Sequence, residues 1–383
     1  MIYLDNQATT ACDPRVTARM LPWFERFFGN PHSVDHPAGR EAAAAVEEAR
    51  GEVAAILGAD PRELVFTSGA TEANNLAIKG AARHARATGD GRRRIVTVGT
   101  EHKCVLESVL DLAGEGFEPV VLPVDADGRL DPDRLRDALR EPTLLVSIML
   151  VNNETGVVQD LNTLGPIVRN AGALLHSDLA QAVGKLPVAV SGLDLASLSA
   201  HKLYGPKGIG ALWVRRRPRV RLTPLFSGGG QERGLRSGTL PAPLIVGFGE
   251  ACRLAGLEGE AERARIGALR DALLVRLRRD IPGLAVNGSL RHRVAGNLNL
   301  RFPERSAADI MAAVPELCLS TGSACSAAEV TPSHVLSAMG LSAAEAARSL
   351  RLGIGRFTSA AELERAAELL CRACAAVPER LPA

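Results

Sequence analysis

Short apolar runs alternate with segments of helical character over the first two-thirds of the chain. The apolar runs are rich in β-branched residues or leucine: Glu63–Phe66, Arg94–Val98, Pro119–Val124, Leu144–Leu150, Ala173–His176 and Leu193–Leu198. The segments of helical character are Glu41–Leu57, Glu72–Ala87, Val105–Ala113, Pro132–Arg140 and Leu164–Asn170. Because strands that alternate with helices pair in parallel and are covered on both faces, the pattern predicts an α/β domain with a mostly parallel sheet.

The pattern changes after about residue 250. Glu250–Asp280 is rich in Arg and Glu and carries a single apolar stripe, which predicts a long helix. The stripe consists of Ile266, Leu269, Leu273 and Leu277. The strands predicted beyond it are Ala285–Val286, Asn297–Arg301 and Leu317–Ser320. A capping box at Ser359 and Glu362 opens a closing helix, so the sequence predicts a second, smaller α+β domain.

Composition narrows the classes of function. The 383 residues contain 45 Lys and Arg against 43 Asp and Glu, and aromatic residues make up only 3%. This balance argues against nucleic-acid binding, which usually needs a concentrated basic face and aromatic side chains for base stacking. No apolar stretch reaches the length of a membrane span, and residues 1–15 lack the basic and apolar regions of a secretory signal. The seven cysteines lack the spacing of a disulfide framework, so we expect free thiols in a reducing cytoplasm.

Polar residues follow five of the predicted strands. The five tails are TSGATEANN, GTEHK, NNETG, DLAQ and AHKLYGPKG. In an open α/β sheet, ligands bind outside the carboxyl ends of the strands, so we expect these tails to meet at one crevice. A single tail of this kind is equally well explained as an ordinary polar loop, but five in succession favour a binding site.

The first tail begins with a turn of small residues, Thr67–Thr71, between a strand and a helix. Such a turn presents backbone N–H groups and hydroxyls to an anion, as phosphate sites do. It lacks the Lys of a Walker loop and the glycine pattern of a dinucleotide-binding turn. Taken alone, it fits an ordinary helix N-cap better than a phosphate site.

An amine, a carboxylate and an imidazole stand near the ends of other predicted strands. Lys202, one of only five lysines, precedes a glycine-rich turn, where its pKa of about 10.4 can fall toward neutrality and suit a Schiff base; the alternative is a surface lysine. Asp178 suits the protonated nitrogen of a pyridine ring, because no cluster of metal ligands accompanies it. His102 is available to stack on such a ring. Together with the phosphate turn, these are the groups that pyridoxal 5′-phosphate (PLP) requires.

Nine sequence strings resemble one enzyme family. In order between about residues 2 and 358, they are LDNQATT, GNPHS, TSGATEANN, TEHK, VNNETGVVQD, HSDLAQAVGK, SAHKLYGPKGIGAL, GGGQERGLRSGT and STGSAC. They are similar to strings of the cysteine desulfurases of the NifS/IscS type. The resemblance implies the type I PLP-dependent transferase fold and a homodimer. It also implies a large PLP-binding domain of residues 14–250 and a small domain of residues 1–13 with 251–383.

The resemblance assigns the cofactor-binding residues. It implies that Lys202 carries PLP covalently, that His102 stacks on the ring and assists proton transfer, and that Asp178 pairs with the ring nitrogen. Gln181 would hydrogen-bond the ring hydroxyl. The residues that would hold the phosphate, the last of them from the other subunit, are Ala70, Thr71, Ser199, His201 and Thr239.

The resemblance also implies how the substrate is bound. Asn153 and Arg351 would fix the substrate carboxylate, Arg351 through the two parallel hydrogen bonds that a guanidinium offers. The motif around Arg351 departs from the usual pattern, because Gly353 stands where relatives have serine. Arg356 is therefore a second candidate for the same role.

A cysteine in a run of small residues completes the implied site. Cys325 lies in STGSACS, and we expect the loop of about residues 321–333 to be mobile, since small side chains pack poorly. The family's reaction would convert L-cysteine to L-alanine and leave the sulfur on Cys325 as a persulfide, for an iron–sulfur scaffold protein or another sulfur acceptor. No metal is required, although Cys325 could transiently ligate a cluster. The base that ionises the thiol stays open between His102 and the substrate's own groups.

Other interpretations stay open. A PLP-dependent aminotransferase or a selenocysteine lyase of similar fold would give a different product, and a non-catalytic scaffold would only deliver sulfur through a partner. Cys371 and Cys374 have CxxC spacing, but without a second pair they fit two core contacts better than half of a zinc site.

Overall fold

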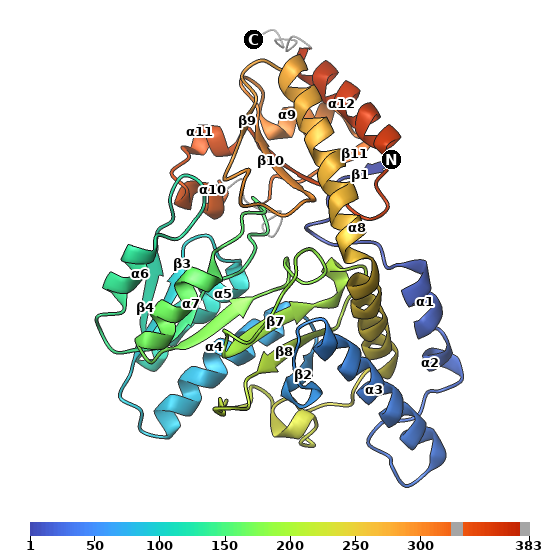
Figure 1. Ribbon diagram of the computed structural model, residues 1–383, viewed down its shortest axis with the longest axis vertical. Helices are drawn as coiled ribbons and strands as arrows, with labels where there is room; N and C mark the ends of the chain where they lie inside the picture. The colour runs from blue at the N-terminus through green and yellow to red at the C-terminus, as the bar shows by residue number, and fades with distance from the viewer. Residues whose placement is uncertain (323–331, 376–383) are drawn as a thin grey trace, which may run out of the picture.

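The main feature of the computed structural model is a mostly parallel sheet (Figure 1); the structure describes residues 1–322 and 332–375. Within these residues the sheet has seven strands, in the spatial order β2-β8-β7-β6-β5-β3-β4. Their bounds are β2 Leu64–Thr67, β3 Arg94–Val98, β4 Glu118–Leu122, β5 Thr143–Ser147, β6 Leu174–Asp178, β7 Leu195–Ser199 and β8 Gly210–Val214. β8 runs antiparallel to both of its neighbours, and all other neighbouring strands pair in parallel.

Helices cover both faces of this sheet, as the alternating pattern predicts. In β2, Val65 belongs to the apolar cluster under α4 (Ala70–Ala87) and α5 (Lys103–Asp111), whereas Leu64 and Phe66 belong to the cluster on the opposite face. The helices packed on that opposite cluster are α1 Pro14–Met20, α2 Pro22–Glu25, α3 Pro37–Ala55, α6 Pro132–Ala138, α7 Leu161–Asn170 and α8 Ala242–Asp280. Except for the edge strand β4, the strands are largely buried, as expected for strands covered on both faces.

The sequence pattern does not predict β8, because this strand begins inside a glycine-rich stretch. The space at Gly210 leaves no room for a side chain: a Cβ atom there would lie 2.4 Å from the Leu198 carbonyl oxygen and 2.7 Å from the Gly69 Cα atom. The glycine therefore lets β8 lie directly against β7 and against the turn that precedes α4. It is needed for close packing and does not end an element.

A second group of strands forms the upper part of the molecule in Figure 1. β10 (Asn297–Arg301) pairs antiparallel with both β9 (Ala285–Val286) and β12 (Ser349–Gly353). β1 (Ile2–Tyr3) pairs in parallel with β11 (Leu317–Cys318), so the first residues of the chain lie in this upper part. The helices here are α9 Ala307–Ala313, α10 His334–Ala338, α11 Ala343–Ala346 and α12 Ala360–Ala375. The upper part has an apolar cluster of its own.

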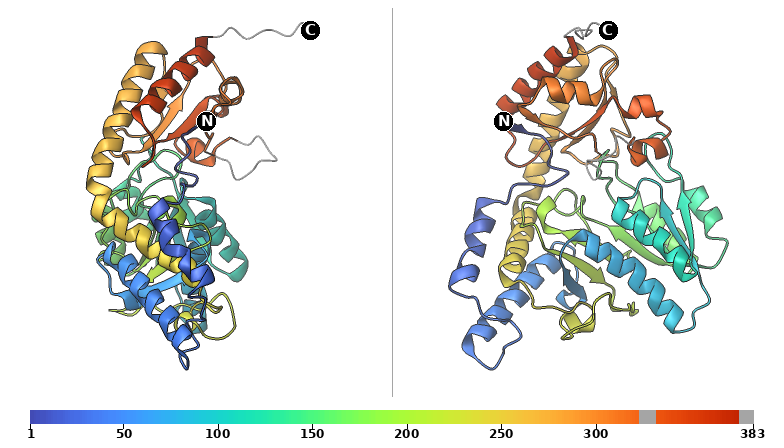
Figure 2. Two further views of the ribbon diagram at one scale, coloured as in Figure 1. Left: turned by 90° about the vertical axis from the view of Figure 1, so that its right-hand side faces the viewer. Right: turned by 180° about the vertical axis from the view of Figure 1, so that it is seen from behind.

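The helix α8 is longer than the sequence pattern predicts, and it runs past both groups of strands (Figures 1 and 2). It begins at Ala242 and not at Glu250. Gly249 does not end the helix but gives a close approach to α3, because a Cβ atom there would lie 2.7 Å from the Ala49 Cα atom. The later half of α8 packs against α12. A continuous helix therefore joins the two parts.

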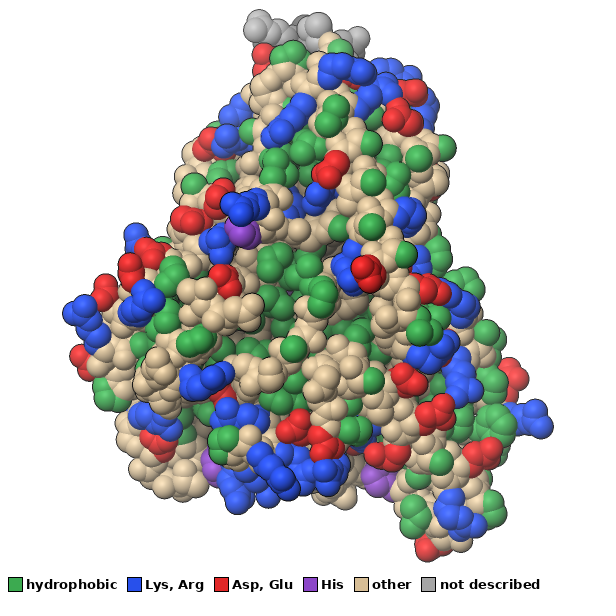
Figure 3. All heavy atoms as spheres, viewed as in Figure 1, with side chains coloured by type: hydrophobic (Ala, Val, Ile, Leu, Met, Phe, Trp, Pro, Cys, Tyr) green, Lys and Arg blue, Asp and Glu red, His purple; other side chains and the backbone are tan. Residues whose placement is uncertain are grey.

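Charged side chains of both signs are spread over the face shown in Figure 3. Basic side chains gather at its lower edge. A pocket beside β2 and β8 is lined by Arg62, Arg215, Arg216, Arg219, Arg221 and Arg233. The even balance of charge in the sequence does not predict this local concentration. Among the described residues, no helix combines the length and apolar character that a membrane crossing requires.

Candidate active site

The carboxyl ends of the parallel strands surround a pocket of about 440 Å³. This volume lies within the range of about 300–1,000 Å³ that is usual for small-molecule sites. The predicted site residues that line it are Ala70, Thr71, His102, Asn153, Asp178, Gln181, Ser199, His201 and Lys202. Among the described residues, Arg351 and Thr239 are not part of the lining, and Cys325 lies outside the described residues. The strand ends converge as the sequence predicts.

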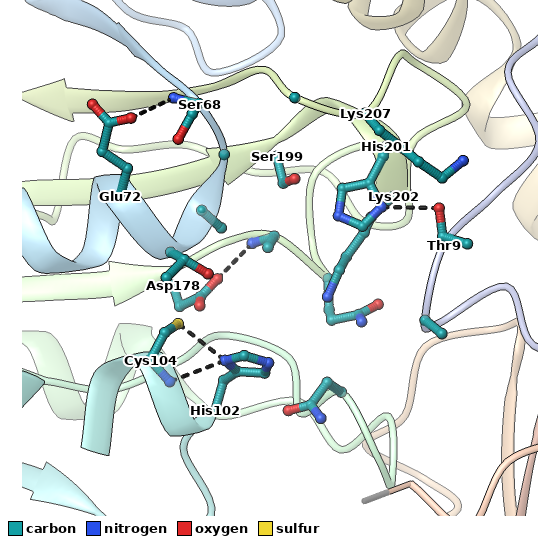
Figure 4. Close-up of a pocket in the computed structure, with 18 of the residues that line it drawn as sticks. Thr9, Ser68, Glu72, His102, Cys104, Asp178, Ser199, His201, Lys202 and Lys207 are labelled. Atoms are coloured by element: carbon teal, nitrogen blue, oxygen red, sulfur yellow. Dashed lines mark hydrogen bonds between the residues drawn. The ribbon is translucent and has the colours of Figure 1, made fainter. Parts of the chain in front are cut away.

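One end of the pocket is suited to an anion. α4 begins at Ala70 after Gly69, whose φ of 154° favours glycine, and Ala70 and Thr71 line the pocket. The first N–H groups of a helix have no partners inside the helix, so they are available to an anion. His201 lies at the same end, and its Nδ1 atom is 3.0 Å from Thr9 Oγ1 (Figure 4). Burial, followed by the charge of Lys202, lowers the pKa of His201 to about 4.

A fixed carboxylate faces the opposite side of the pocket. Asp178 is the last residue of β6 and is 5% exposed. Its Oδ1 atom accepts a hydrogen bond from the Ala180 backbone N–H at 2.8 Å, and its Oδ2 atom accepts one from Asn74 Nδ2 at 2.7 Å. Sequence reasoning did not single out Asn74, although its place in TSGATEANN, one turn into a buried helix, is the signal that marks it. The two donors hold the carboxylate in position.

His102 begins α5 as its N-cap residue. Its Nδ1 atom accepts a hydrogen bond from the Cys104 backbone N–H at 3.2 Å and lies 3.0 Å from Cys104 Sγ (Figure 4). Burial is the main reason that the pKa of His102 is lowered, and the charge of Lys202 lowers it further. The imidazole is therefore favoured as a neutral ring in the pocket.

Lys202 follows β7 in the short helical turn Ala200–Lys202 and lines the pocket. Figure 4 shows its side chain reaching into the space that Asp178 and His102 also face. The structure thus brings together the amine, the carboxylate and the imidazole that the sequence places on three separate strand ends.

The amide of Gln181 is held at both of its polar atoms. Its Oε1 atom accepts a hydrogen bond from Lys185 Nζ at 2.5 Å, and its Nε2 atom donates one to the Gln7 carbonyl oxygen at 2.8 Å. Since a carbonyl oxygen only accepts, these contacts fix which end of the amide is the NH₂ group. The second N–H of that group is the part of Gln181 suited to a ring hydroxyl oxygen.

Arg351, in β12, is bound by the chain itself. Its Nη2 atom donates to Asp5 Oδ1 at 2.7 Å, and its Nη1 atom donates to the Asn153 carbonyl oxygen at 2.9 Å. The side chain of Asn153 lines the pocket, and its Oδ1 atom is buried without a hydrogen-bond partner among the described residues. Arg351 therefore lies beside the pocket, and its guanidinium is hydrogen-bonded to the Asp5 carboxylate.

Arg356, the second candidate for the carboxylate, makes different contacts. Its Nη1 atom lies 2.8 Å from Asp13 Oδ2, its Nε atom lies 2.7 Å from Glu262 Oε2, and its guanidinium stacks 4.2 Å from the centre of the Tyr204 ring. These contacts join the N-terminal segment to α8. In this arrangement Arg356 ties segments together and does not face the pocket lining.

The remaining described thiols and acidic groups form no metal site. Among residues 1–322 and 332–375, no three His, Cys, Asp or Glu side chains are grouped so that they could hold a metal ion. Cys371 and Cys374 lie on α12 and pack against the apolar cluster of the upper part. Burial raises the pKa of Cys374 to about 11. These are the contacts of core residues.

Comparisons with known proteins decide the family. The family model described as "Aminotransferase class-V" matches residues 2–366. A "Cysteine desulfurase IscS" from Rickettsia bellii is 50% identical over 372 residues, which are 97% of this chain and 90% of the relative. The chain belongs to the class-V aminotransferase family, in its cysteine desulfurase branch.

Two solved structures are similar to this class-V chain over nearly its whole length. A "NifS-like protein" has a TM-score of 0.89 and 34% identity, covering 97% of this chain and 98% of its own. A structure described as "SspA in complex with cysteine" has a TM-score of 0.82 and 37% identity, covering 94% of this chain and 100% of its own. The predicted family and the type I PLP-dependent transferase fold are both confirmed.

PLP is the cofactor of this class-V branch, as predicted, and the residues of the pocket fit it. The first turn of α4 offers N–H groups of the kind that bind phosphate, whereas the Ser68 N–H before it is bound by Glu72 Oε2 at 2.8 Å. Asp178 offers a buried carboxylate for a protonated ring nitrogen, and Lys202 offers an amine for an aldehyde. All three groups line the same pocket.

Proposed function

We propose that this class-V enzyme takes sulfur from L-cysteine, releases L-alanine and leaves the sulfur on Cys325 as a persulfide. The observation that carries the proposal is the convergence of Lys202, Asp178 and His102 on one pocket, in a chain that is half identical to a named cysteine desulfurase. The solved relative described as bound to cysteine supports the choice of substrate.

Three residues of the chain would have separate roles around the cofactor. Bound PLP would supply an electron sink next to the Cα atom of the amino acid. Asp178, fixed by two donors, would keep the ring nitrogen protonated, and the face of His102 would lie against the ring. Lys202 Nζ would accept the proton that leaves Cα and return it to the product. Proton transfer by a placed side chain accelerates such steps by about 10²–10⁴-fold.

The sulfur transfer conserves atoms and electrons. The Cβ–S bond of L-cysteine breaks, an S–S bond forms on Cys325, and the Cys325 thiol proton is balanced by the proton that Cβ gains. One amino acid and one thiol thus give L-alanine and one persulfide, without an external oxidant. A thiol with a pKa of about 8.5 is only slightly ionised at neutral pH, so the thiolate has to be formed in the site.

The substrate carboxylate would bind between Asn153 and Arg351. Asn153 offers its side-chain amide from the pocket lining. Arg351 would exchange the Asp5 carboxylate, now 2.7 Å from its Nη2 atom, for that of the substrate. The guanidinium donates one hydrogen bond to Asp5, and it would donate to the substrate carboxylate in the same way.

The proposal includes a homodimer and two domains. Thr239 is exposed and lies outside the pocket of its own chain, as a residue that serves the phosphate of the other subunit would. Separate apolar clusters support a large domain of residues 14–250 and a small domain of residues 1–13 with 251–383. We place the enzyme in the cytoplasm, with an iron–sulfur scaffold protein or another sulfur carrier as acceptor.

The experiment that tests this function replaces Cys325 with serine. Alanine release from L-cysteine should fall by at least about 100-fold, because the nucleophile is lost, while the absorbance of bound PLP persists. The control Cys371→Ser changes a thiol on α12 and should keep the parental rate. A parental rate in Cys325→Ser would refute the persulfide, and a keto acid product from the parent would indicate an aminotransferase.

A further inference from the structure

Cys104 is a thiol that lines the pocket, and the proposed reaction does not use it. Its side chain lies beside His102 and Asp178 (Figure 4). Burial raises the pKa of Cys104 to about 12, the charge of Asp178 adds to the rise, and hydrogen bonds from Asn74 and Thr71 oppose it. A thiol that stays protonated is a poor nucleophile. It keeps its S–H as a hydrogen-bond donor.

The acceptor for that S–H is His102 Nδ1, 3.0 Å from Cys104 Sγ. The Cys104 backbone N–H, 3.2 Å from the same nitrogen, can only donate. Nδ1 is therefore the ring nitrogen that carries the lone pair. Both the thiol and the backbone of Cys104 point their hydrogens at one atom of the imidazole.

The other side of the thiol is also held. Asn74 Nδ2 donates one N–H to Cys104 Sγ at 3.1 Å and the other to Asp178 Oδ2 at 2.7 Å. The sulfur thus accepts a hydrogen bond from Asn74, while its own proton is directed away toward His102. Hydrogen bonds through Asn74 and Cys104 therefore connect the Asp178 carboxylate to the His102 imidazole.

We propose that Cys104 is a positioning residue that fixes His102 as the neutral tautomer with its proton on Nε2. In this tautomer the ring offers its face and an N–H donor to the pocket, and its basic lone pair is turned to Cys104. His102 is then unable to act as the base that ionises Cys325, so that task falls to the substrate's own groups. Only this last step rests on the proposed function.

The charges around the two side chains favour the same state. Burial lowers the pKa of His102, the charges of Lys202, His334 and Lys103 lower it further, and Asp178 opposes them. Around Cys104, the charges of Asp178 and Glu101 both disfavour the thiolate. A neutral imidazole that accepts from a protonated thiol is therefore the arrangement that the surroundings support near neutral pH.

The tautomer can be read by NMR of isotope-labelled histidine in the PLP-bound protein, with the His102 signals identified from His102→Gln. Cys104→Ala removes the S–H donor, Cys104→Ser keeps a donor, and Cys252→Ala removes a buried thiol on α8 outside the pocket. The parent, Cys104→Ser and Cys252→Ala should carry the proton on Nε2. Cys104→Ala keeps the backbone N–H that donates to Nδ1, so the proton should stay mainly on Nε2, but the loss of the thiol donor should raise the pKa of His102 by about 0.5–1 unit.

The pH profile of alanine release gives a second readout. Its acid limb should move to higher pH in Cys104→Ala and return in Cys104→Ser, whereas a merely structural thiol would change the rate equally at every pH. The inference is overturned if parental His102 carries its proton on Nδ1, or if the pKa of His102 in Cys104→Ala equals that of the parent. The NMR result does not depend on turnover; failure of the proposed function would appear separately, as a parent that releases no alanine.

Discussion

The two ends of the pocket are prepared differently for their ligands. At the ring end, Asp178 is held by the N–H groups of Asn74 and Ala180, and neither donor has to move for a ring nitrogen to approach. At the substrate end, Arg351 is already paired with the carboxylate of Asp5. The ring end is preorganised, whereas the substrate end has to exchange one carboxylate for another.

The difference follows from where the residues come from. The ring end is built from neighbouring strands of one sheet, whose carboxyl ends share an edge. The substrate end joins residue 5, the turn at Asn153 and β12, which belong to distant parts of the chain. Preorganisation lowers the cost of binding. Cofactor affinity should therefore depend on the rigid sheet, and substrate affinity on the competition between two carboxylates.

The largest expected effect is at the ring end. Replacing Lys202 with alanine should reduce alanine release by about 10²–10⁴-fold, because the group that carries the Cα proton is lost. The control Lys79→Ala removes an amine that pairs with Asp111 outside the pocket, and it should keep the parental rate. Borohydride reduction and peptide mapping of the parent should label Lys202. A label on another lysine would show that Lys202 does not carry PLP and that the ring end of the pocket is wrongly assigned.

The strand that carries Asp178 also contains an acid-sensitive residue. His176, in β6, lies between Ser147 Oγ at 2.8 Å and Ser197 Oγ at 2.9 Å, and burial lowers its pKa to about 4. An unfolded histidine has a pKa of about 6.5, so between these values only the unfolded chain binds the proton. The contribution of neutral His176 to the free energy of unfolding is complete above about pH 6.5. About 3 kcal/mol of that free energy is lost as the pH falls to about 4.

Urea unfolding at several pH values between 7 and 4 measures this loss. His176→Asn should flatten the decline in the free energy of unfolding, whereas His32→Gln, which changes an exposed ring, should leave it as in the parent. Equal declines in all three proteins would show that His176 does not set the acid stability of the sheet.

The smallest expected effect is at the substrate end. Asp5→Asn removes the carboxylate that competes for Arg351, so the KM for L-cysteine should fall a few-fold while PLP affinity stays unchanged. The free energy of unfolding should fall by about 1.5–3 kcal/mol, because a hydrogen bond between charged groups is lost. Asp35→Asn, at an exposed position, is the control. A higher KM would mean that Asp5 holds Arg351 in place for the substrate.

Sequence reasoning succeeded where local pattern and sheet topology act together. Lys202, Asp178 and His102 each follow a short apolar strand, and parallel strands bring their carboxyl ends to one edge, so their meeting could be predicted. It did not predict β8, which begins at Gly210, and it began the long helix at Glu250, although Gly249 lies inside α8. At both positions a distant segment packs so closely that a side chain would not fit. The local sequence does not reveal that segment.

The sequence by itself determined the family, the cofactor and the residues that face the pocket from the strand ends, because these depend on motifs and on the order of strands. Only the tertiary structure decided that Asp5 occupies Arg351 and that Asn74 and Cys104 connect Asp178 to His102. Apart from the contact between Cys104 and His102, which are two residues apart, those contacts join residues that are far apart in the chain. Their partners are chosen by distance and hydrogen-bond direction in the folded protein, which no linear pattern contains.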